Sequence, residues 1–552
     1  MYAVEPHVMF EGSDREDVGD ALVRLAERFG TDTFFGVVSI HNQPIIDRLA
    51  ASARYVPVRH EASAINAADA YSRVTGKLGV AITSTGTGAG NAAGSLIEAH
   101  TAGSQVLHIT GQIETAFLGQ GRGVIHETKN QLGMLESVSK FAATASTTEE
   151  LGTLLIEAAQ QAIAPPSGPV SIEIPIDIQY GKVSLPAESN IPSPPILEDE
   201  IETAADLIAD SQQPAIWIGG GAVGSEVEVR QLAERLGAAV FTSAAGRGVI
   251  DEREDFVIGN FASSEQGASL LAEADLLISI GTHHRSNETK HYQLKFPERH
   301  IQIDIDPRAI ARSYPVTLGI IGTAKAAVSG LIPAIGERSV NTVWLETVKA
   351  SGRAARQKIA NDIGPYLALC DSLRKHLPGP SPFVRDVTIA ASSWGNRLFP
   401  IYDASTNVNP RGGGIGQGLA MGLGAAIARP DLPTLLLVGD GGLALQTGEL
   451  GSIAQENPWL VTVLFNDGGY GVLRNLQDQH FDRRAGVDLV TPDFELLARS
   501  FEIDYYLIAD SDDVDRVVSE AFSLGRPVII EVDCNDFGTM NSPFVPPIPL
   551  PI

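Results

Sequence analysis

Cysteine, basic residues and long apolar runs are all scarce in this sequence. The 552 residues include two cysteines, Cys370 and Cys534, which excludes a disulfide framework and fits a reducing cytoplasm. No stretch of about 18 uncharged apolar residues occurs, so we expect no membrane span. The first residues lack the basic and apolar segments of a signal peptide. We therefore predict a cytoplasmic protein.

Acidic residues greatly outnumber basic ones. The chain has 67 aspartates and glutamates against 40 lysines and arginines, a formal net charge of −27. Such a surface repels nucleic acid phosphates and anionic lipids, so we expect neither as a partner. An anionic substrate or cofactor would need a local site of backbone N–H groups, basic side chains or a metal ion.

Short apolar segments alternate with helical patterns along most of the chain. This alternation predicts an α/β fold with three doubly wound parallel-sheet domains, because strands that alternate with helices form sheets covered on both faces. A Pro/Ser-rich stretch at 185–195 separates the first two domains. The expected bounds are 1–184 for the first domain, 196–335 for the middle domain, 336–376 for a helical linker and 377–552 for the third domain.

Two apolar segments in the third domain end in glycine-rich turns. Residues 434–438 run into 439–442 (GDGG), and 461–465 run into 466–471 (NDGGYG). In a parallel sheet both turns lie at the carboxyl edge, where α/β folds bind ligands. The side chains of Asp440 and Asn466 and the carbonyl of Gly468 are oxygen ligands suited to Mg²⁺. Two ordinary glycine-rich turns are the alternative, and the pairing of the turns favours the metal site.

These turns resemble the diphosphate–Mg²⁺ motif of the thiamine-diphosphate decarboxylase and carboligase superfamily, including acetolactate synthase. The resemblance covers nearly the whole chain in the family's order of pyrimidine-binding, middle and diphosphate-binding domains. It implies thiamine diphosphate and Mg²⁺ as cofactors, with Asp440, Asn466 and Gly468 as metal ligands. It also implies that the cofactor's diphosphate contacts Gly439, Gly441, Gly442, Gly469 and Tyr470.

Residues 59–62 (RHEA) follow a short apolar run and resemble the family's glutamate motif. The resemblance assigns cofactor activation to Glu61. A carboxyl group beside the aminopyrimidine N1′ stabilises the imino tautomer that removes the C2 proton of the thiazolium, and partial desolvation favours a shared proton there. Taken alone, Glu61 would be interpreted as a helix N-terminal cap.

Other motifs resemble family segments around the cofactor. Residues 83–91 (TSTGTGAGN) and 109–112 (ITGQ) imply that Asn91 and Gln112 lie near the cofactor, with Gln112 able to donate to a substrate oxygen. The glycine-rich stretch 412–428 implies that Leu419 wedges the cofactor into its bent form. It also implies that the carbonyl of Gln417 accepts from the 4′-amino group.

The resemblance also places two histidines and an apolar wall around the reaction pocket. His41 and His126 fall in loops that line this pocket in relatives, and either could transfer protons near neutral pH. Solvated or capping histidines are the equal alternative. Val472, Leu473 and Leu476 would form an apolar wall, which is compatible with a substrate larger than pyruvate.

Departures from named relatives leave the reaction open. Acetolactate synthases usually carry a glutamine where this chain has His126, and a tryptophan where it has Leu476. Residues 470–474 (YGVLR) instead resemble benzoylformate decarboxylase, whose pocket histidine aligns with Ser84. We expect an enzyme that decarboxylates a 2-oxo acid donor to an enamine and transfers it to an acceptor carbonyl. Simple decarboxylation is the second interpretation, and a C–C lyase or hydrolase acting on a 2-oxo or dione substrate is the third.

A glycine turn in the middle domain raises the alternative of a nicotinamide dehydrogenase. Residues 219–224 (GGGAVG) satisfy G-x-G-x-x-G, but the next strand, 239–242, ends without the acidic residue that holds a ribose. In relatives this domain binds FAD or ADP or stays empty, so FAD is an open expectation here. A non-catalytic binding protein is disfavoured because Glu61, Asp440 and Asn466 are all present.

The family's active site lies between the first domain of one chain and the third domain of another. The resemblance therefore implies a homodimer or a dimer of dimers. We expect a small 2-oxo acid as substrate, and neither nucleic acid nor membrane as a partner.

Overall fold

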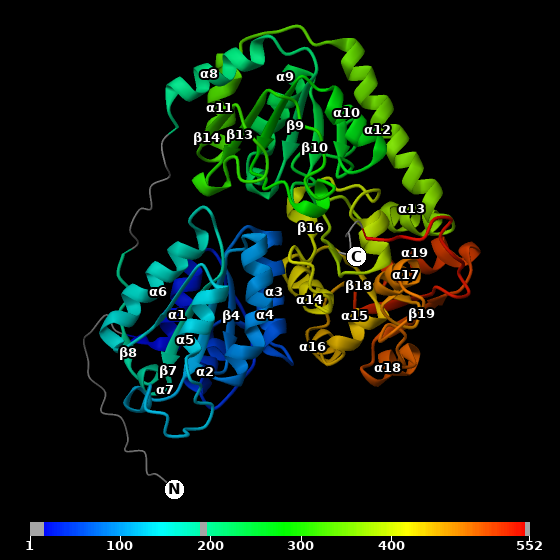
Figure 1. Cartoon of the computed structure of the whole chain (residues 1–552). Coiled ribbons are helices and arrows are strands. Elements are labelled where there is room, and N and C mark those ends of the chain that lie inside the picture. The colour runs from blue at the N-terminus through cyan, green and yellow to red at the C-terminus, as the bar shows by residue number, and fades with distance from the viewer. Residues whose placement is uncertain (1–15, 188–195, 547–552) are drawn as a thin grey trace.

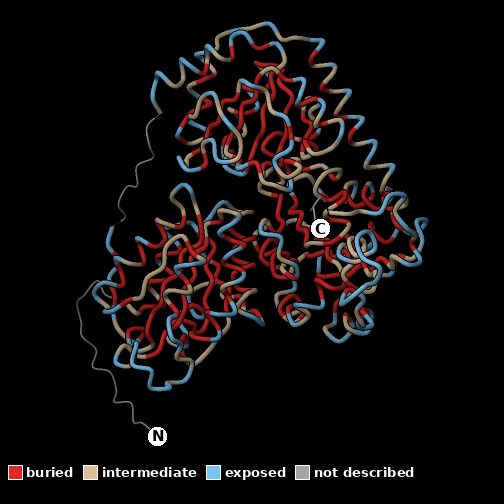
Figure 2. Tube along the Cα trace, in the orientation of Figure 1, coloured by how far each residue is buried: buried red, intermediate tan, exposed pale blue. Residues whose placement is uncertain are grey.

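The structure, a computed structural model, describes residues 16–187 and 196–546. It contains three six-stranded parallel sheets, one in each lobe of Figure 1, as the sequence predicted. Figure 2 shows that buried residues concentrate in the interior of each lobe, and each domain has at least one apolar cluster of its own. Most of the predicted linker, 188–195, lies outside the described residues. Within the described ranges, no helix has the length and apolar character needed to cross a bilayer.

The first domain is a parallel sheet with helices on both faces. Its strands lie in the order β3-β2-β4-β5-β7-β6. The strands are β2 (Thr33–Gly36), β3 (Arg54–Pro57), β4 (Gly79–Thr83), β5 (Val106–Gln112), β6 (Phe141–Thr144) and β7 (Val170–Pro175). Helices α1 (Val18–Arg28), α2 (Gln43–Ser52) and α6 (Thr148–Ile163) cover one face, and α3 (Glu61–Thr75), α4 (Thr87–Ala102) and α5 (Gln131–Val138) cover the other.

The middle domain has a different strand order, β11-β10-β9-β12-β13-β14. Its strands are β9 (Pro214–Ile218), β10 (Ala239–Thr242), β11 (Val257–Gly259), β12 (Leu276–Ile280), β13 (His300–Asp304) and β14 (Leu318–Ile321). Its helices are α8 (Glu198–Ala209), α9 (Glu226–Leu236), α10 (Glu265–Glu273) and α11 (Ala324–Ala334). The predicted helical linker consists of α12 (Thr342–Ile363) and α13 (Tyr366–His376), separated at Gly364 and Pro365. Proline has no N–H to continue the first helix.

The third domain repeats the topology of the first. Its strand order is β16-β15-β17-β18-β20-β19, which matches the first domain strand for strand. The strands are β15 (Phe383–Arg385), β16 (Asn407–Val408), β17 (Thr434–Gly439), β18 (Leu460–Asn466), β19 (Asp504–Ile508) and β20 (Val528–Asp533). The helices are α14 (Gly418–Ala428), α15 (Asp440–Leu445), α16 (Glu449–Glu456), α17 (Gly471–His480), α18 (Phe494–Ser500) and α19 (Val514–Ser523).

The first and third domains pack against each other through α3 and α14 (Figure 1). The two helices cross closely at Gly424, where a Cβ atom would collide with the carbonyl oxygen of Ala67. A glycine at this position therefore lets the backbones approach. The two domains share one apolar core on this side.

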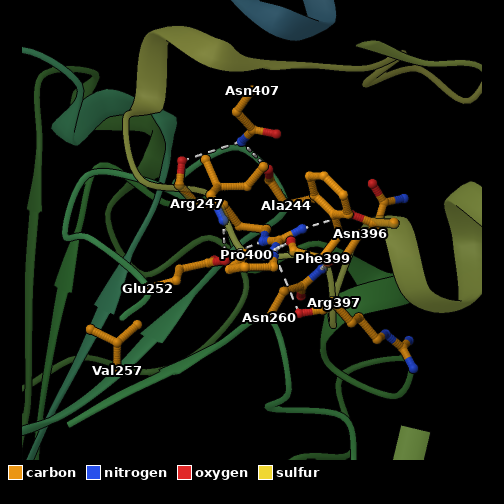
Figure 3. Close-up of polar contacts among 12 residues, drawn as sticks. Ala244, Arg247, Glu252, Val257, Asn260, Asn396, Arg397, Phe399, Pro400 and Asn407 are labelled. Atoms are coloured by element: carbon orange, nitrogen blue, oxygen red, sulfur yellow. Dashed lines mark hydrogen bonds and ion pairs between the residues drawn. The ribbon is translucent and has the colours of Figure 1, made fainter. Parts of the chain in front are cut away.

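The buried side chain of Arg247 joins the middle domain to the third (Figure 3). Arg247 Nη2 lies 2.6 Å from Glu252 Oε2, and both side chains are almost fully buried. The same guanidinium donates to the carbonyl of Gly395 at 2.9 Å and to that of Phe399 at 2.6 Å. The ion pair itself lies within the middle domain, so the bonds to the two third-domain carbonyls are what join the domains. Losing them would leave buried donors of a charged group unsatisfied, at about 1–3 kcal/mol or more.

Candidate active site

A pocket of about 200 Å³ opens where β17 and β18 end in the third domain. The paired strands bring Gly439 beside Phe465, so the two predicted glycine turns are neighbours. The residues lining the pocket are Val387, Thr388, Ile389, Gly413, Ile415, Gly439, Asp440, Gly441, Gly442, Phe465, Asp467, Gly469, Tyr470, Gly471, Val472 and Leu473. Within the described part of the chain, no first-domain residue lines it.

Asp440 is the first residue of α15 and is buried against the second turn. Its Oδ1 accepts from the N–H of Gly441 at 2.7 Å, and its Oδ2 accepts from the N–H of Gly469 at 2.8 Å. Burial raises the pKa of this carboxyl group, and the two hydrogen bonds oppose that effect. The turns after β17 and β18 are thereby tied together through Asp440.

The structure brings Asp467, and not the predicted Asn466, to the pocket. Asn466 donates from its amide to Glu531 at 2.8 Å, and it is absent from the pocket lining in the described ranges. The Gly468 carbonyl, also predicted as a ligand, accepts from the N–H of Leu489 at 2.9 Å. The sequence analysis named Asn466, and the residue whose side chain faces the pocket is the next one along the chain, Asp467.

Asp467 has the properties expected of a cation ligand. Its Oδ1 is buried without a hydrogen-bond partner among the described residues, and Arg474 Nη1 lies 3.6 Å away. Burial, and then the charge of Asp440, raise the pKa of Asp467 to about 6. A bound cation would offset both the burial of these two carboxylates and the effect of Asp440 on Asp467.

The set of donors fits Mg²⁺ better than a transition metal. In the described residues, no group of three or more histidines, cysteines or carboxylates is arranged to hold a metal ion. Mg²⁺ is usually bound by one or two carboxylates and completes its octahedron with neutral oxygens, phosphate oxygens and water. The carbonyl of Gly469 is a third candidate, since a Cβ on Gly441 would lie 3.4 Å from it.

The predicted diphosphate-binding residues all lie in the pocket wall. These residues are Gly439, Gly441, Gly442, Gly469 and Tyr470. A Cβ on Gly441 would approach the Tyr470 ring to 2.6 Å, so glycine is needed for the ring to lie there. The backbone is thus exposed to a ligand at several consecutive positions, which suits an anionic group.

Leu419 is not at the pocket. It is 1% exposed within α14 and packs into the core shared with α3, whereas Ile415 lines the pocket and is 40% exposed. We therefore correct the prediction for the apolar wedge to Ile415. The carbonyl of Gln417 accepts from the N–H of Met421 at 3.0 Å as α14 begins, and its predicted contact with the cofactor stays a prediction.

The predicted apolar wall is present in part. Val472 and Leu473, in the first turn of α17, line the pocket together with Ile389 and Phe465. Leu476 lies one turn further along α17 and does not line the pocket. The structure thus supports an apolar wall without Leu476.

Glu61 lies at the carboxyl edge of the first sheet, as the first residue of α3. Its Oε2 accepts from the amide of Asn91 at 3.0 Å, which joins two residues predicted to be near the cofactor. The alternative of a capping role is not supported, because the side chain of His60 accepts from the N–H of Ala62 and caps the helix.

Gln112 ends β5 on the same edge and is held by neighbours. Its Oε1 accepts from the hydroxyl of Thr85 at 3.3 Å and from the N–H of Ile113 at 2.8 Å. Its Nε2 lies 3.4 Å from Glu173 Oε1, a weak contact that leaves this amide able to donate elsewhere. The predicted role toward a substrate oxygen stays a prediction.

His41 and His126 face each other across the loops that follow β2 and β5. Their ring centroids are 5.4 Å apart in an edge-to-face arrangement. Nδ1 of His41 is buried without a hydrogen-bond partner in the described part of the chain. Burial, and then the nearby His126, lower the pKa of His41, while Glu114 opposes the shift. His41 is therefore neutral at pH 7 and can take up a proton.

The glycine turn of the middle domain is closed by hydrogen bonds within the chain. The N–H of Gly219 donates to the Ile280 carbonyl at 2.8 Å, and that of Gly221 donates to the Gly281 carbonyl at 3.0 Å. The N–H of Gly224 donates to Glu226 Oε1 at 2.8 Å. These three N–H groups are unavailable to a dinucleotide diphosphate, so the turn does not fit the nicotinamide fingerprint.

Comparison with protein families explains why the glycine-turn pocket of the third domain and the Glu61 region of the first domain occur in one chain. The profile of the thiamine pyrophosphate enzyme N-terminal TPP binding domain matches residues 16–134, and the central domain profile matches 201–331. The profile of the C-terminal TPP binding domain matches 390–532. The chain belongs to the thiamine pyrophosphate enzyme family, and it is a thiamine-diphosphate-dependent enzyme.

Individual relatives differ in the reaction that their names give. A probable 2-ketoarginine decarboxylase of Pseudomonas aeruginosa is 30% identical over 525 residues, covering 93% of this chain and 93% of that protein. An acetolactate synthase large subunit of Parasynechococcus marenigrum is 27% identical, covering 96% and 89%. A probable acetolactate synthase large subunit of Methanocaldococcus jannaschii is 26% identical, covering 96% and 93%.

Proposed function

We propose that the enzyme decarboxylates a 2-oxo acid with thiamine diphosphate and Mg²⁺. The observation that carries this proposal is that two carboxylates, the buried Asp440 and the partly buried Asp467, line one pocket together with the backbone of the two glycine turns. Asp440, Asp467 and the carbonyl of Gly469 would hold the metal ion. Thiamine diphosphate, when bound, supplies the carbanion chemistry for breaking the bond beside the 2-oxo group.

The chain's own residues would handle protons and orientation. Glu61, held by Asn91, is the group that exchanges a proton with the cofactor's pyrimidine ring. His41 and His126, whose rings lie 5.4 Å apart between centroids, are the nearest candidates to deliver a proton to the product. Gln112 would donate from Nε2 to a substrate oxygen.

Two copies of the chain are needed to complete this site. The pocket is lined by the third domain, while Glu61, Gln112 and the histidines belong to the first. Val38, Ile40 and Ile125 are more than half exposed beside His41 and His126, which suits burial against another chain. We infer a homodimer in which the first domain of one copy covers the pocket of the other, and a dimer of dimers is compatible with it.

Mixing two inactive variants tests this arrangement. Glu61→Gln and Asp440→Ala each remove one half of the site, so each homodimer should be inactive. A hybrid dimer contains one intact site out of two, and half of the dimers in an equal mixture are hybrids, so the mixture should regain about a quarter of the wild-type activity. A tagged chain verifies that the subunits have exchanged. If the exchanged mixture regains no activity, the site is not shared between two chains.

Decarboxylation takes precedence over carboligation here, although the sequence alone put carboligation first. Release of an aldehyde requires a proton donor at the carbon that loses CO₂, and the paired histidines offer one. The name of the relative with 30% identity supports the same reaction. Acetolactate-type carboligation is the second candidate, favoured by the apolar wall of Val472 and Leu473 and by the synthase relatives.

The direct test separates the two products. Pyruvate, benzoylformate and 2-ketoarginine are supplied singly with thiamine diphosphate and Mg²⁺, and CO₂, aldehyde and acyloin are quantified. Aldehyde in equal amount to CO₂ supports decarboxylation, whereas a ligated acyloin-type 2-hydroxy-3-oxo acid in equal amount to CO₂, with little free aldehyde, supports acetolactate-type carboligation. Failure of the protein to bind thiamine diphosphate in calorimetry would overturn both.

A further inference from the structure

The segment 409–417 forms one wall of the pocket without being part of any helix or strand. Gly413 and Ile415 line the pocket, and Gly413 and Gly416 both have φ of +81°. Because this segment has no ladder or helix partners, its backbone polar groups need partners from elsewhere. Charged side chains from all three domains provide them.

Two first-domain side chains hold the beginning of the segment. Glu98, on α4, is 2% exposed, and its carboxylate accepts from the N–H groups of Arg411 and Gly412, the latter at 2.6 Å. Arg73, on α3, donates to the Asn409 carbonyl at 2.7 Å and to Glu98 at 3.3 Å. One carboxylate thus binds two consecutive N–H groups, as an anion does in a backbone nest.

The other two domains hold the remainder. Arg285 of the middle domain donates to the Arg411 carbonyl at 2.5 Å and to the Thr101 carbonyl, at the end of α4, at 3.1 Å. Asp386 of the third domain accepts from the N–H of Gly416 at 3.1 Å and from that of Gly418 at 3.0 Å. The segment is therefore fixed on both sides of Gly413 and Ile415.

We propose that Glu98 is a positioning residue that holds this wall of the cofactor pocket in its binding conformation, supported by Arg73 and Arg285. The inference rests on the proposed function, because it takes thiamine diphosphate as the occupant. Glycine-rich backbone is costly to order. A clamp that orders it before binding removes that cost from the binding step.

The variant Glu98→Gln keeps the size of the side chain and removes one of its two acceptor oxygens. In this variant an amide NH₂ faces a backbone N–H. With saturating Mg²⁺, we expect thiamine diphosphate to bind about tenfold more weakly by calorimetry. The kcat at saturating cofactor should stay within about threefold of the wild type, which separates positioning from chemistry. The control is Glu157→Gln, an exposed carboxylate on α6 of the same domain.

Hydrogen exchange of the cofactor-free protein provides a readout that does not depend on activity. Peptides covering 409–418 should exchange faster in Glu98→Gln, whereas β12 should be unchanged. If Glu98→Gln does not fold, Arg285→Ala should give the same pattern with a smaller amplitude. Unchanged affinity and unchanged exchange in these variants would overturn the clamp. If the wild type binds no thiamine diphosphate, the proposed function fails instead, and the exchange data still test the clamp.

Discussion

The first and third domains share one topology but present opposite chemistry at their carboxyl edges. In the third domain the functional groups follow β17 and β18, whereas in the first domain Glu61 follows β3, Asn91 follows β4 and Gln112 ends β5. The first domain presents Gln112 and the Glu61–Asn91 pair, whose polar atoms are mostly bonded within the chain. The third presents Asp440 and Asp467: burial raises the pKa of both carboxyl groups, and the charge of Asp440 raises that of Asp467 further.

The difference shows that the same sheet edge is used for two tasks. In the proposed function, the first-domain residues already bonded within the chain orient groups and exchange protons. The neighbouring carboxylates of the third domain are the groups we propose to bind the metal ion. The fold supplies the position, and the residues at the strand ends supply the chemistry.

The largest effect should come from a substitution in the third domain, at the proposed metal site. Asp440→Ala removes a carboxylate that joins both glycine turns, so we expect thiamine diphosphate binding in the presence of Mg²⁺ to weaken by at least about 100-fold. Calorimetry measures this, with the exposed Asp431→Ala as the matched control. Binding at the wild-type level in Asp440→Ala would mean that the third domain does not contain the metal site.

Substitution of Glu61 in the first domain, the proposed proton-exchange group, should lower turnover more than cofactor binding. Glu61→Gln keeps the bond to Asn91 possible, so thiamine diphosphate should bind within a few fold of the wild type. Turnover should fall about 100-fold or more, because a group that transfers protons typically contributes 10²–10⁴. Steady-state kinetics with Glu136→Gln as control would check it. Equal turnover in Glu61→Gln would remove the contrast between the two domains.

A narrower comparison distinguishes neighbours within the second turn. Asp467→Asn should weaken Mg²⁺ binding about 30-fold, because it removes a charged ligand. Asn466→Ala should weaken Mg²⁺ binding less than about tenfold, because it removes only the hydrogen bond to Glu531. Titration of the cofactor-loaded protein with Mg²⁺ measures both. The reverse ranking would restore the ligand set predicted from sequence.

The smallest effect concerns stability and tests the first domain alone. His108 on β5 is fully buried between Thr83 and Ser171, and burial lowers its pKa to about 3. The unfolded chain gains a proton below about pH 6.5 that the folded chain does not, so stability falls as pH drops from there toward 3, by up to about 1.4 kcal/mol per pH unit.

This slope can be measured between pH 7.5 and 5 by urea unfolding, with the hydrogen exchange of β5 amides as the probe. His108→Asn should be less stable at pH 7.5 but should lose less stability on acidification. A slope unaltered by the substitution would assign the acid sensitivity to other groups.

Most of the architecture could be predicted from sequence, and part of the site could not. The apolar runs at 434–438 and 461–465 predicted β17 and β18 because fully buried parallel strands are continuously apolar. The sequence analysis placed two side chains at the pocket incorrectly. Asp467 lies there in place of Asn466, one residue away, and Ile415 lies there in place of Leu419, four residues away. Gly416, with φ of +81°, changes the direction of the chain between Ile415 and Leu419, and residue type alone does not reveal this.

The amino-acid sequence by itself determined three parallel sheets and the positions of their glycine-rich strand ends, because apolar periodicity and turn residues act locally. The tertiary structure alone decided that Asp467 and Ile415 face the pocket and that Leu419 belongs to the core with α3. It also decided that Glu98 holds a segment more than 300 residues away along the chain. Such contacts depend on how separate domains pack, because a buried charged group such as Glu98 finds its hydrogen-bond partners on another domain.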